Sequence, residues 1–390
     1  MSKWEIVMLG EIGDFYTGGT PSRKRSDFFE GIHPWITTPA LGATNIDASY
    51  ANALITDEAI QKSATKLIPA NSLMIGVRVG IGKASINTCP MCTNQDIVSI
   101  SNIDTARISL EYLHKYIATK KEFLDSQKRG ATIQGIKIEL LKNLTIPLPP
   151  LQVQQQIADT LDHASDLIEK RKSQIEKLDL LVKSQFIEMF GDPGINPKGW
   201  GQAALKDIGI GKLAYGSGAS SCEYDGIVRY VRITDIENNG ELNANLVSPS
   251  VIDERYLLNE GDILFARSGA TVGKTYRYRE SDGKCLFAGY LIRLIPDWNK
   301  VLPDYVFYFT KTGYYESFIS ANAKIVAQPN INAKQYGELA ICVPPLSLQS
   351  EFAGFVQQVE AQKSLFQQSL AKLELNYKSL MQKCFRGEIF

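Results

Sequence analysis

The chain has 390 residues and a mass of 43.3 kDa, long enough for two or three domains, and its 44% hydrophobic and 22% charged side chains are ordinary for a globular protein. Lysine and arginine (42) balance aspartate and glutamate (42), so a DNA-binding surface would have to concentrate its basic groups locally. Six irregularly spaced cysteines, no signal-like start and no apolar run of about 18 residues exclude a disulfide framework, a secretory leader and a membrane helix, and favour the cytoplasm.

Residues 1–148 predict a first globular domain of the α+β class. Short β-rich runs at 72–77 and 97–100 alternate with segments rich in glycine, proline and asparagine. Near its start, residues 17–25 form a basic, hydroxyl-rich segment that is suited to close approach to a phosphate backbone. The candidate DNA contacts in this segment are Thr20, Ser22, Arg23 and Lys24.

Residues 149–190 predict a linker that consists mainly of one long helix. Pro149 and Pro150 stiffen the junction, and the segment 152–190 has no glycine or proline. Apolar residues recur in it with a heptad period, which is typical of a coiled coil, and the helix would be roughly 55 Å long at about 1.5 Å per residue. The predicted seam contains Ile157, Leu161, Ile168, Ile175, Leu178 and Val182.

The remaining half of the chain repeats this arrangement. Residues 191–342 predict a second α+β domain, and residues 343–390 a second linker helix. The second seam contains Phe352, Val356, Val359, Phe366, Leu370 and Leu373.

The two halves are related by a constant offset. The string IPLPPLQ at Ile146 reappears as ICVPPLSLQ at Ile341, and Pro149 aligns with Pro344, an offset of 195 (344 − 149). A repeat of this size indicates a duplicated domain with its linker. Because the second helix leaves the second domain, pairing with the first helix predicts an antiparallel coiled coil with the chain ends close together. The alternative is a stalk that pairs with another copy of the chain.

Two glycine-rich segments, 76–83 and 267–275, each present an arginine and a lysine. The second ends in Gly-Lys-Thr, but Ser268 stands where a phosphate-binding P-loop requires its first glycine. We expect tight turns between strands, with Arg78, Lys83, Arg267 and Lys274 as candidate DNA contacts; ordinary solvated turns are the alternative.

Further polar side chains are candidates for DNA contact. Gln134 and Gln328 each precede the strand that leads to a linker, and a glutamine amide can read adenine bidentately. The segment 215–221 occupies in the second domain the place of 17–25 in the first. The other candidates are Ser217, Ser220 and Arg232.

No catalytic constellation is found in the sequence. Cys89 and Cys92 have no second pair, and the three histidines are scattered, so a zinc site is not expected. Leu148 and Val343 precede the two Pro-Pro pairs, where an amino-group methyltransferase would need Asn or Asp. The sequence therefore favours a protein that recognises or positions, not an enzyme.

The order of domain, Pro-Pro-Leu junction and long helix, repeated twice, resembles the specificity subunit of type I restriction-modification systems. The stretches GGTPSRK at Gly18, LLKNLTIPLPPLQVQQQIA at Leu140 and CFRGEI at Cys384 add to this resemblance, which extends over the whole chain.

The resemblance implies two pseudo-symmetric target recognition domains separated by a long antiparallel two-helix coiled coil. It implies that each domain reads one half of a bipartite, asymmetric DNA site and that the helices fix the spacer. The implied partners are double-stranded DNA, two adenine methyltransferase subunits and restriction subunits. S-adenosylmethionine, ATP and magnesium are then expected on those subunits and not on this chain. The alternative function is a coiled-coil adaptor that binds only proteins.

Overall fold

The computed structural model describes residues 4–128, 135–323 and 329–390. The chain divides into two compact units, one formed by residues 1–171 with 369–390 (unit 1) and the other by residues 172–368 (unit 2). The dividing points lie inside two long helices, α5 (Leu151–Phe190) and α9 (Leu346–Arg386), which the predicted linkers contain. The predicted domain bounds stay predictions. No helix in the described ranges is long and apolar enough to cross a membrane.

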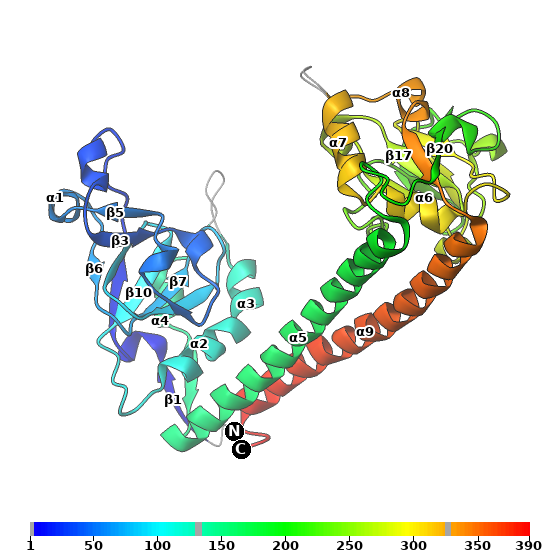
Figure 1. The fold of residues 1–390 in the computed structure, drawn as a ribbon. Coiled ribbons are helices and arrows are strands. Elements are labelled where there is room, and N and C mark those ends of the chain that lie inside the picture. Colours follow the sequence, from blue (N-terminus) through cyan, green and yellow to red (C-terminus); the bar gives the residue numbers. More distant parts are fainter. Residues whose placement is uncertain (1–3, 129–134, 324–328) are drawn as a thin grey trace. The chain divides into compact units, whose positions relative to one another are not determined.

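The globular part of unit 1 is built on two sheets and one strand pair (Figure 1). The five-stranded sheet has the order β2 (Asp14–Thr17), β10 (Ile97–Ser101), β7 (Leu73–Gly76), β8 (Ala84–Asn87) and β4 (Asn45–Ile46). The four-stranded sheet has the order β5 (Ala53–Ile55), β3 (His33–Ile36), β9 (Met91–Thr93) and β6 (Leu67–Ile68), with β3 and β9 parallel. The antiparallel pair is β1 (Glu5–Met8) with β11 (Thr145–Leu148), next to the start of α5.

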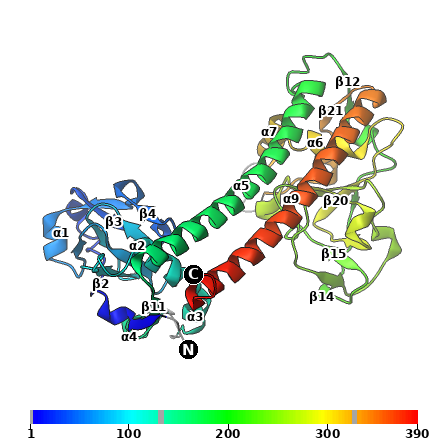
Figure 2. The same cartoon turned by 90° about the horizontal axis from the view of Figure 1, so that it is seen from below.

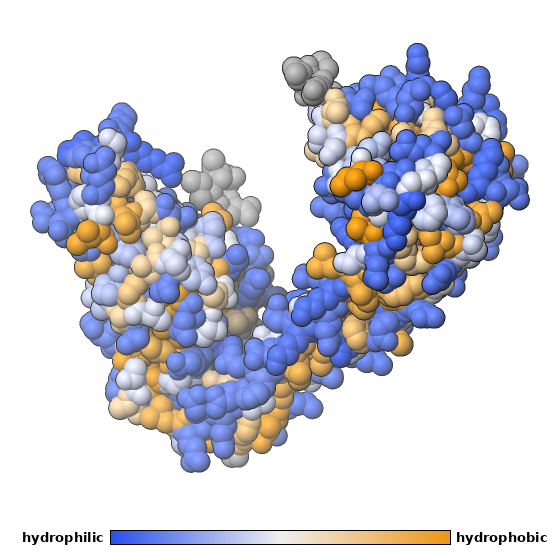
Figure 3. Space-filling model, in the orientation of Figure 1, coloured by the Kyte–Doolittle hydropathy of each residue, from blue (hydrophilic) through white to orange (hydrophobic). Residues whose placement is uncertain are grey.

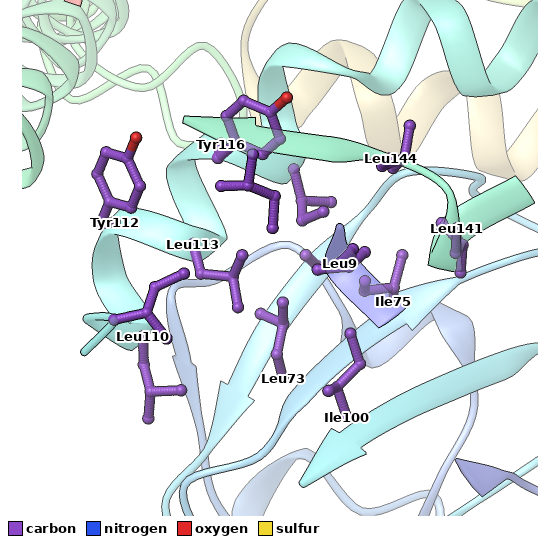
Figure 4. Close-up of a cluster of buried hydrophobic side chains, with 14 of the residues drawn as sticks. Leu9, Leu73, Ile75, Ile100, Leu110, Tyr112, Leu113, Tyr116, Leu141 and Leu144 are labelled. Carbon is purple, nitrogen blue, oxygen red and sulfur yellow. The ribbon is translucent and has the colours of Figure 1, made fainter. Parts of the chain in front are cut away.

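Helices pack on both sheets of unit 1 and complete its cores. The α-helices are α1 (Asp57–Gln61), α2 (Leu110–Thr119), α3 (Lys121–Ser126) and α4 (Ile138–Lys142), and the 3₁₀ turns are η1 (Leu9–Glu11), η2 (Ser26–Phe29), η3 (Thr38–Ala40) and η4 (Ala48–Tyr50). Leu73, Ile75 and Ile100 on the sheet face Leu110 and Leu113 on α2 (Figure 4). Burial of such apolar side chains stabilises the unit by about 25 cal/mol per Å² of apolar surface removed from water.

Unit 2 repeats the same elements with fewer strands. Its four-stranded sheet has the order β13 (Ala214–Tyr215), β20 (Leu291–Leu294), β17 (Ile263–Ala266) and β18 (Thr275–Arg277). The strand pairs are β12 (Gly201–Ala204) with β21 (Ala340–Val343), β14 (Ser221–Glu223) with β16 (Val247–Pro249), and the parallel pair β15 (Arg229–Val231) with β19 (Cys285–Phe287). The parallel pair β15–β19 matches the parallel pair β3–β9 of unit 1.

The core of unit 2 is rich in aromatic rings. Its α-helices are α6 (Pro303–Phe309), α7 (Gly313–Asn322) and α8 (Ala333–Gly337), and its 3₁₀ turns are η5 (Leu205–Asp207), η6 (Glu254–Tyr256), η7 (Gly269–Thr271) and η8 (Glu280–Asp282). Tyr305 on α6 stacks on Phe186 of α5, with ring centroids 5.4 Å apart. This contact anchors the end of α5 to the globular part of unit 2.

Within each unit, one part of α5 lies beside one part of α9 (Figures 1 and 2). In unit 1, Ile157 near the start of α5 shares a core with Phe385 at the end of α9. In unit 2, Phe186 near the end of α5 meets Phe352 near the start of α9, with ring centroids 5.5 Å apart. Both pairings have the order of an antiparallel pair, so the predicted fold class is confirmed. Trp4 lies beside Gly387, which brings the two ends of the described chain together in unit 1.

The predicted seam residues occupy the less exposed positions of α5 and α9. Seven are buried: Ile157, Leu161, Ile168, Val182, Phe352, Val356 and Val359. Five are half-buried: Ile175, Leu178, Phe366, Leu370 and Leu373. In the space-filling view, hydrophilic residues predominate on the visible face and apolar residues form small patches (Figure 3).

A buried glutamine ties the start of each long helix to its globular part. In unit 1, Gln154 accepts from the Ser109 amide at 2.8 Å and donates to the carbonyls of Pro149 at 2.8 Å and Arg107 at 3.0 Å. Gln349, 195 residues later, makes the same three bonds in unit 2, to Leu302, Pro344 and Lys300. Both side chains are fully buried, so each junction depends on this one amide.

Candidate nucleic-acid interface

In unit 1, the turn that joins β9 to β10 (residues 94–96) lies next to the loop that contains the predicted candidate Thr20. The Gly19 amide donates to the Thr93 carbonyl at 2.8 Å, and the Thr20 hydroxyl donates to Gln95 Oε1 at 2.5 Å. This approach requires glycine at position 18, since a Cβ there would lie 2.2 Å from the Asn94 oxygen. Thr20 and Gln95 are exposed, so their polar groups face solvent together.

The glycine-rich loop 76–83 lies on the other side of the same turn. The Val77 amide donates to the Asp96 carbonyl at 2.8 Å, and the Arg78 guanidinium lies 3.7 Å from the Asp96 carboxylate. The Arg78 side chain remains 43% exposed, and Lys83, at the end of the loop, is also exposed. The structure therefore brings the two predicted loops of unit 1 to one turn. We call Thr20, Arg78, Gln95 and Asp96 the first polar surface.

In unit 2, the corresponding turn joins β19 to β20 (residues 288–290). The Ser217 amide donates to the Phe287 carbonyl at 2.9 Å, and the Arg267 amide donates to the Tyr290 carbonyl at 3.1 Å. Tyr290, the last residue of the turn, is 62% exposed. We call Tyr215, Arg267, Tyr290 and Asn330 the second polar surface.

Arg267 carries the positive charge of the second polar surface. Its guanidinium lies 4.7 Å from the centroid of the Tyr215 ring, and its Nε donates to Asn330 Oδ1 at 3.2 Å. Among the ion pairs of residues 4–128, 135–323 and 329–390, none involves Arg267. A guanidinium that lies on an aromatic face and has no carboxylate partner is available to bind an anionic ligand such as a phosphate.

The same backbone hydrogen bonds hold both turns. In unit 1, Val77 receives a bond from the Ile136 amide, and in unit 2 Arg267 receives one from the Ile331 amide, both at 2.9 Å. Equivalent hydrogen bonds also close the two loops. The Gly82 amide donates to the Gly76 carbonyl, and the Gly273 amide donates to the Ala266 carbonyl, both at 3.0 Å. These pairs place Asp96 in register with Tyr290 and Lys83 with Lys274. The frame is therefore repeated, and the exposed side chains on it differ.

Several predicted candidates in unit 2 have intramolecular partners. Ser217 is buried, and its hydroxyl accepts from the Ala219 amide at 3.1 Å. Arg232 pairs with the buried Asp235 at 2.8 Å, and Lys274 donates to the Ile236 carbonyl at 3.0 Å. Ser220 is exposed, and its amide donates to the Ser250 hydroxyl at 3.1 Å.

The basic segment of unit 1 is open to solvent. Ser22, Arg23 and Lys24 are exposed, whereas the neighbouring Arg25 pairs with Asp27 and, at 3.3 Å, with Glu58. The hydrogen bond from Arg25 holds the pKa of the Asp27 carboxyl below its usual value. Gln134 and Gln328 lie outside the described residues.

The Gly-Lys-Thr sequence of unit 2 does not form a phosphate-binding loop. Thr275 is buried, and its hydroxyl lies 2.6 Å from the hydroxyl of Thr310, while the Lys274 ammonium bonds to a carbonyl. Neither group is available for the phosphates and magnesium of a nucleotide. Cys89 and Cys92 are free thiols, and no group of three or more His, Cys, Asp and Glu in the described chain is arranged to hold a metal ion.

Sequence reasoning had missed Gln95 and Tyr290. Each is an exposed residue at a turn between two buried strands. The available signal was local: a polar run, Thr93 to Asp96, and a glycine followed by tyrosine at 289–290 both interrupt apolar β-rich segments.

Comparison with known proteins identifies the two repeats. Residues 1–177 and 197–375 each match the family model of the type I restriction modification DNA specificity domain. The chain is 26% identical to the Type I restriction enzyme MjaIX specificity subunit of Methanocaldococcus jannaschii, over 99% of this chain and 93% of that protein. It is 36% identical to the EcoR124I/EcoR124II specificity subunit of Escherichia coli, over 40% of each chain.

Solved structures share the fold at low sequence identity. A chain from a structure of a type I restriction-modification system aligns with a TM-score of 0.64 and 18% identity, over 99% of this chain and 98% of that one. The specificity subunit of M. genitalium aligns with a TM-score of 0.52, also at 18% identity, over 98% and 96% of the two chains.

Proposed function

This chain belongs to the family of type I restriction-modification DNA specificity proteins, and from this premise we propose that it is the DNA-recognition subunit of such a complex. Unit 1 reads one half of a bipartite DNA site and unit 2 reads the other, with a fixed spacer between them. The observation that carries the proposal is the repeated frame: equivalent hydrogen bonds hold two turns whose exposed side chains differ. Because the two units have the same hydrogen-bonded frame but different exposed side chains, we expect them to recognise two unlike half-sites.

The chain itself carries out no chemistry in this proposal. Two adenine methyltransferase subunits bind it and hold S-adenosylmethionine, and a restriction subunit holds ATP and magnesium. The antiparallel contacts of α5 and α9 within each unit support a role of these helices as the scaffold and spacer. The complex acts in the cytoplasm.

The proposed DNA contacts begin with the phosphate backbone. Arg78 and Arg267 lie beside the two turns, and Arg23 and Lys24 lie on an exposed loop of unit 1. Because the chain has a formal net charge of 0, these local groups and the partner subunits supply the electrostatic attraction. Binding is therefore expected to weaken steeply as the salt concentration rises.

The test is selection from a random duplex pool with the complex of this chain and its methyltransferase subunits. We expect enrichment of two different motifs at a constant separation, and methylation mapping of genomic DNA should give the same two motifs. Uniform recovery of the pool would contradict DNA recognition and would favour the coiled-coil adaptor.

A further inference from the structure

The turns at 94–96 and 288–290 each present one exposed side chain from a buried setting. Residues 91–94 and 97–101 are buried, and Gln95 between them is exposed. Residues 285–288 and 291–292 are buried, and Tyr290 between them is exposed. A side chain on a turn that is anchored on both sides loses little entropy when it contacts a ligand.

Both turns are rigidly placed by neighbours from distant parts of the chain. In unit 1, the loops at Gly19 and Val77 bond to the two ends of the turn, at 2.8 Å each. In unit 2, Ser217 and Arg267 make the equivalent bonds, at 2.9 and 3.1 Å. A substitution at Gln95 or Tyr290 therefore changes the exposed chemistry without removing any of these backbone bonds.

We infer that these two turns are the base-reading elements of the chain, with Gln95 and Tyr290 as the residues that make its two half-sites different. This inference rests on the proposed function and adds to it the residues that set specificity. Because the hydrogen-bonded frame is repeated, each turn meets its half-site in the same way. The exposed side chains differ in chemistry and by one position in the frame, since Asp96 and not Gln95 is in register with Tyr290.

Gln95 reads by hydrogen bonds. Its carboxamide can accept from N6 and donate to N7 of adenine, the bidentate contact that glutamine makes in the major groove. The Thr20 hydroxyl donates to Gln95 Oε1 at 2.5 Å and leaves the second lone pair of that oxygen and both N–H groups for a base. Thr20 is thus a positioning residue that orients the amide.

Tyr290 reads by contact of its ring. Its exposed face can lie against a base or a thymine methyl group, and its hydroxyl can bond to a base edge. The Arg267 amide donates to the Tyr290 carbonyl, and the Arg267 guanidinium, 4.7 Å from the centroid of the Tyr215 ring, supplies charge for the adjacent phosphates. Unit 2 therefore recognises its half-site through shape and apolar contact more than through an amide.

The test uses the full chain in complex with its methyltransferase subunits and measures binding to duplex libraries in which one half-site at a time is randomised. We expect Gln95→Ala to lower the preference for one base pair of a single half-site by about 10- to 100-fold and to leave the other half-site unchanged. Tyr290→Ala should have the corresponding effect on the opposite half-site only.

Matched controls remove the same side chains elsewhere in the same units. Gln61→Ala changes an exposed glutamine on α1, and Tyr224→Ala an exposed tyrosine of unit 2. Each of these control variants should have the same base preferences at the two half-sites as the natural chain. For the positioning residue, Thr20→Val should weaken the preference that depends on Gln95, and Thr20→Ser should restore it.

The outcomes separate this inference from the proposed function. If the natural complex enriches no motifs, DNA recognition itself is wrong. If it enriches two motifs but the Gln95 and Tyr290 variants retain both preferences, or lose both half-sites equally, these turns are not the specificity elements. The thermal unfolding temperature of each variant is compared with that of the natural chain. Equal values show that a lost base preference reflects changed readout and not loss of the fold.

Discussion

Lys311 is a half-buried lysine whose positive charge weakens the folded state at and below neutral pH. It follows α6 and lines a cavity of about 370 Å³ in unit 2. Burial, with added repulsion from Lys183 and Lys274, lowers the pKa of its ammonium from 10.5 to about 7. Its bond to the Thr275 hydroxyl, at 3.0 Å, compensates only in part.

The sign of the pH dependence follows from this lowered pKa. Between about pH 7 and pH 10, the unfolded chain carries a proton on Lys311 that the folded chain lacks, so this residue makes stability rise with pH across that window. Below about pH 7 the folded chain must bury the charge, and the destabilisation is complete. The folded chain is free of this destabilisation only above the pKa that Lys311 has in the unfolded chain.

Lys311→Met should therefore stabilise unit 2 by about 1–3 kcal/mol at pH 6 and by much less at pH 10. Urea unfolding at several pH values measures the difference between variant and natural chain. Lys284→Met, at an exposed position, is the control and should give no pH-dependent difference. A loss of stability in Lys311→Met at pH 6 would contradict the proposed destabilisation.

The partners and burial of single side chains were the features that the sequence predicted least well. Arg232 and Lys274 read as free basic groups in the sequence, but their partners, Asp235 and the Ile236 carbonyl, depend on how loops fold back. Ser217 looked like an exposed hydroxyl, but it is buried beneath the turn. Pairing of loop side chains depends on neighbours that no local pattern specifies.

At the scale of elements, the apolar periodicity of the sequence predicted the positions of the long helix and of two strands. The heptad pattern over 152–190 agrees closely with α5, and the β-rich runs at 72–77 and 97–100 contain or overlap β7 and β10. A helix of forty residues has a strong apolar period and clear proline and glycine stops. The order of strands in the sheets was not predicted, because it depends on long-range pairing.

The junction between each globular part and its helix depends on Gln154 and Gln349. Replacing either by leucine keeps the volume but leaves one backbone amide and two carbonyls, at least one of them buried, without their partner. Gln154→Leu should destabilise unit 1, and Gln349→Leu unit 2, by roughly 2–4 kcal/mol.

Unfolding followed by tryptophan fluorescence and by hydrogen exchange measures these losses. Gln156→Leu, two positions away on the exposed face of α5, is the matched control and should change stability by less than about 0.5 kcal/mol. Equal losses for Gln154→Leu and Gln156→Leu would show that the buried amide is not what stabilises the junction. The common offset of 195 that aligns the two glutamines was visible in the sequence (349 − 154), but their burial was not.

For the whole molecule, duplication would allow one chain to address an asymmetric site, as the proposed function requires. Each unit contains a globular part with its own core and portions of both long helices. The two frames can diverge in their exposed turns while the buried junctions remain the same, since the side chains at 95 and 290 contribute little to either core. Under the proposed function, we therefore expect that specificity can change in one half-site without affecting the fold or the other half-site.

The spacer between the half-sites is the property that the two helices together should determine. The ion pair of Lys363 with Asp179, at 2.7 Å, fixes the register of α9 on α5 in unit 2. Deleting residues 168–174 together with residues 367–373 removes one heptad from each helix and conserves the seam, apart from a small rotation of about 20°. Each helix becomes shorter by about 10 Å.

The shortened chain should select half-sites about three base pairs closer together than the natural chain does, since each base pair advances the DNA axis by about 3.4 Å. Selection from duplex libraries with variable spacers measures this shift, and the two base motifs themselves should not change because both turns are untouched. Deleting only one of the two heptads is the control: it shifts the seam on one helix only, so the helices can no longer pair along their length, and assembly should be lost. An unchanged spacer in the double deletion would mean that the methyltransferase subunits, and not these helices, set the distance between the half-sites.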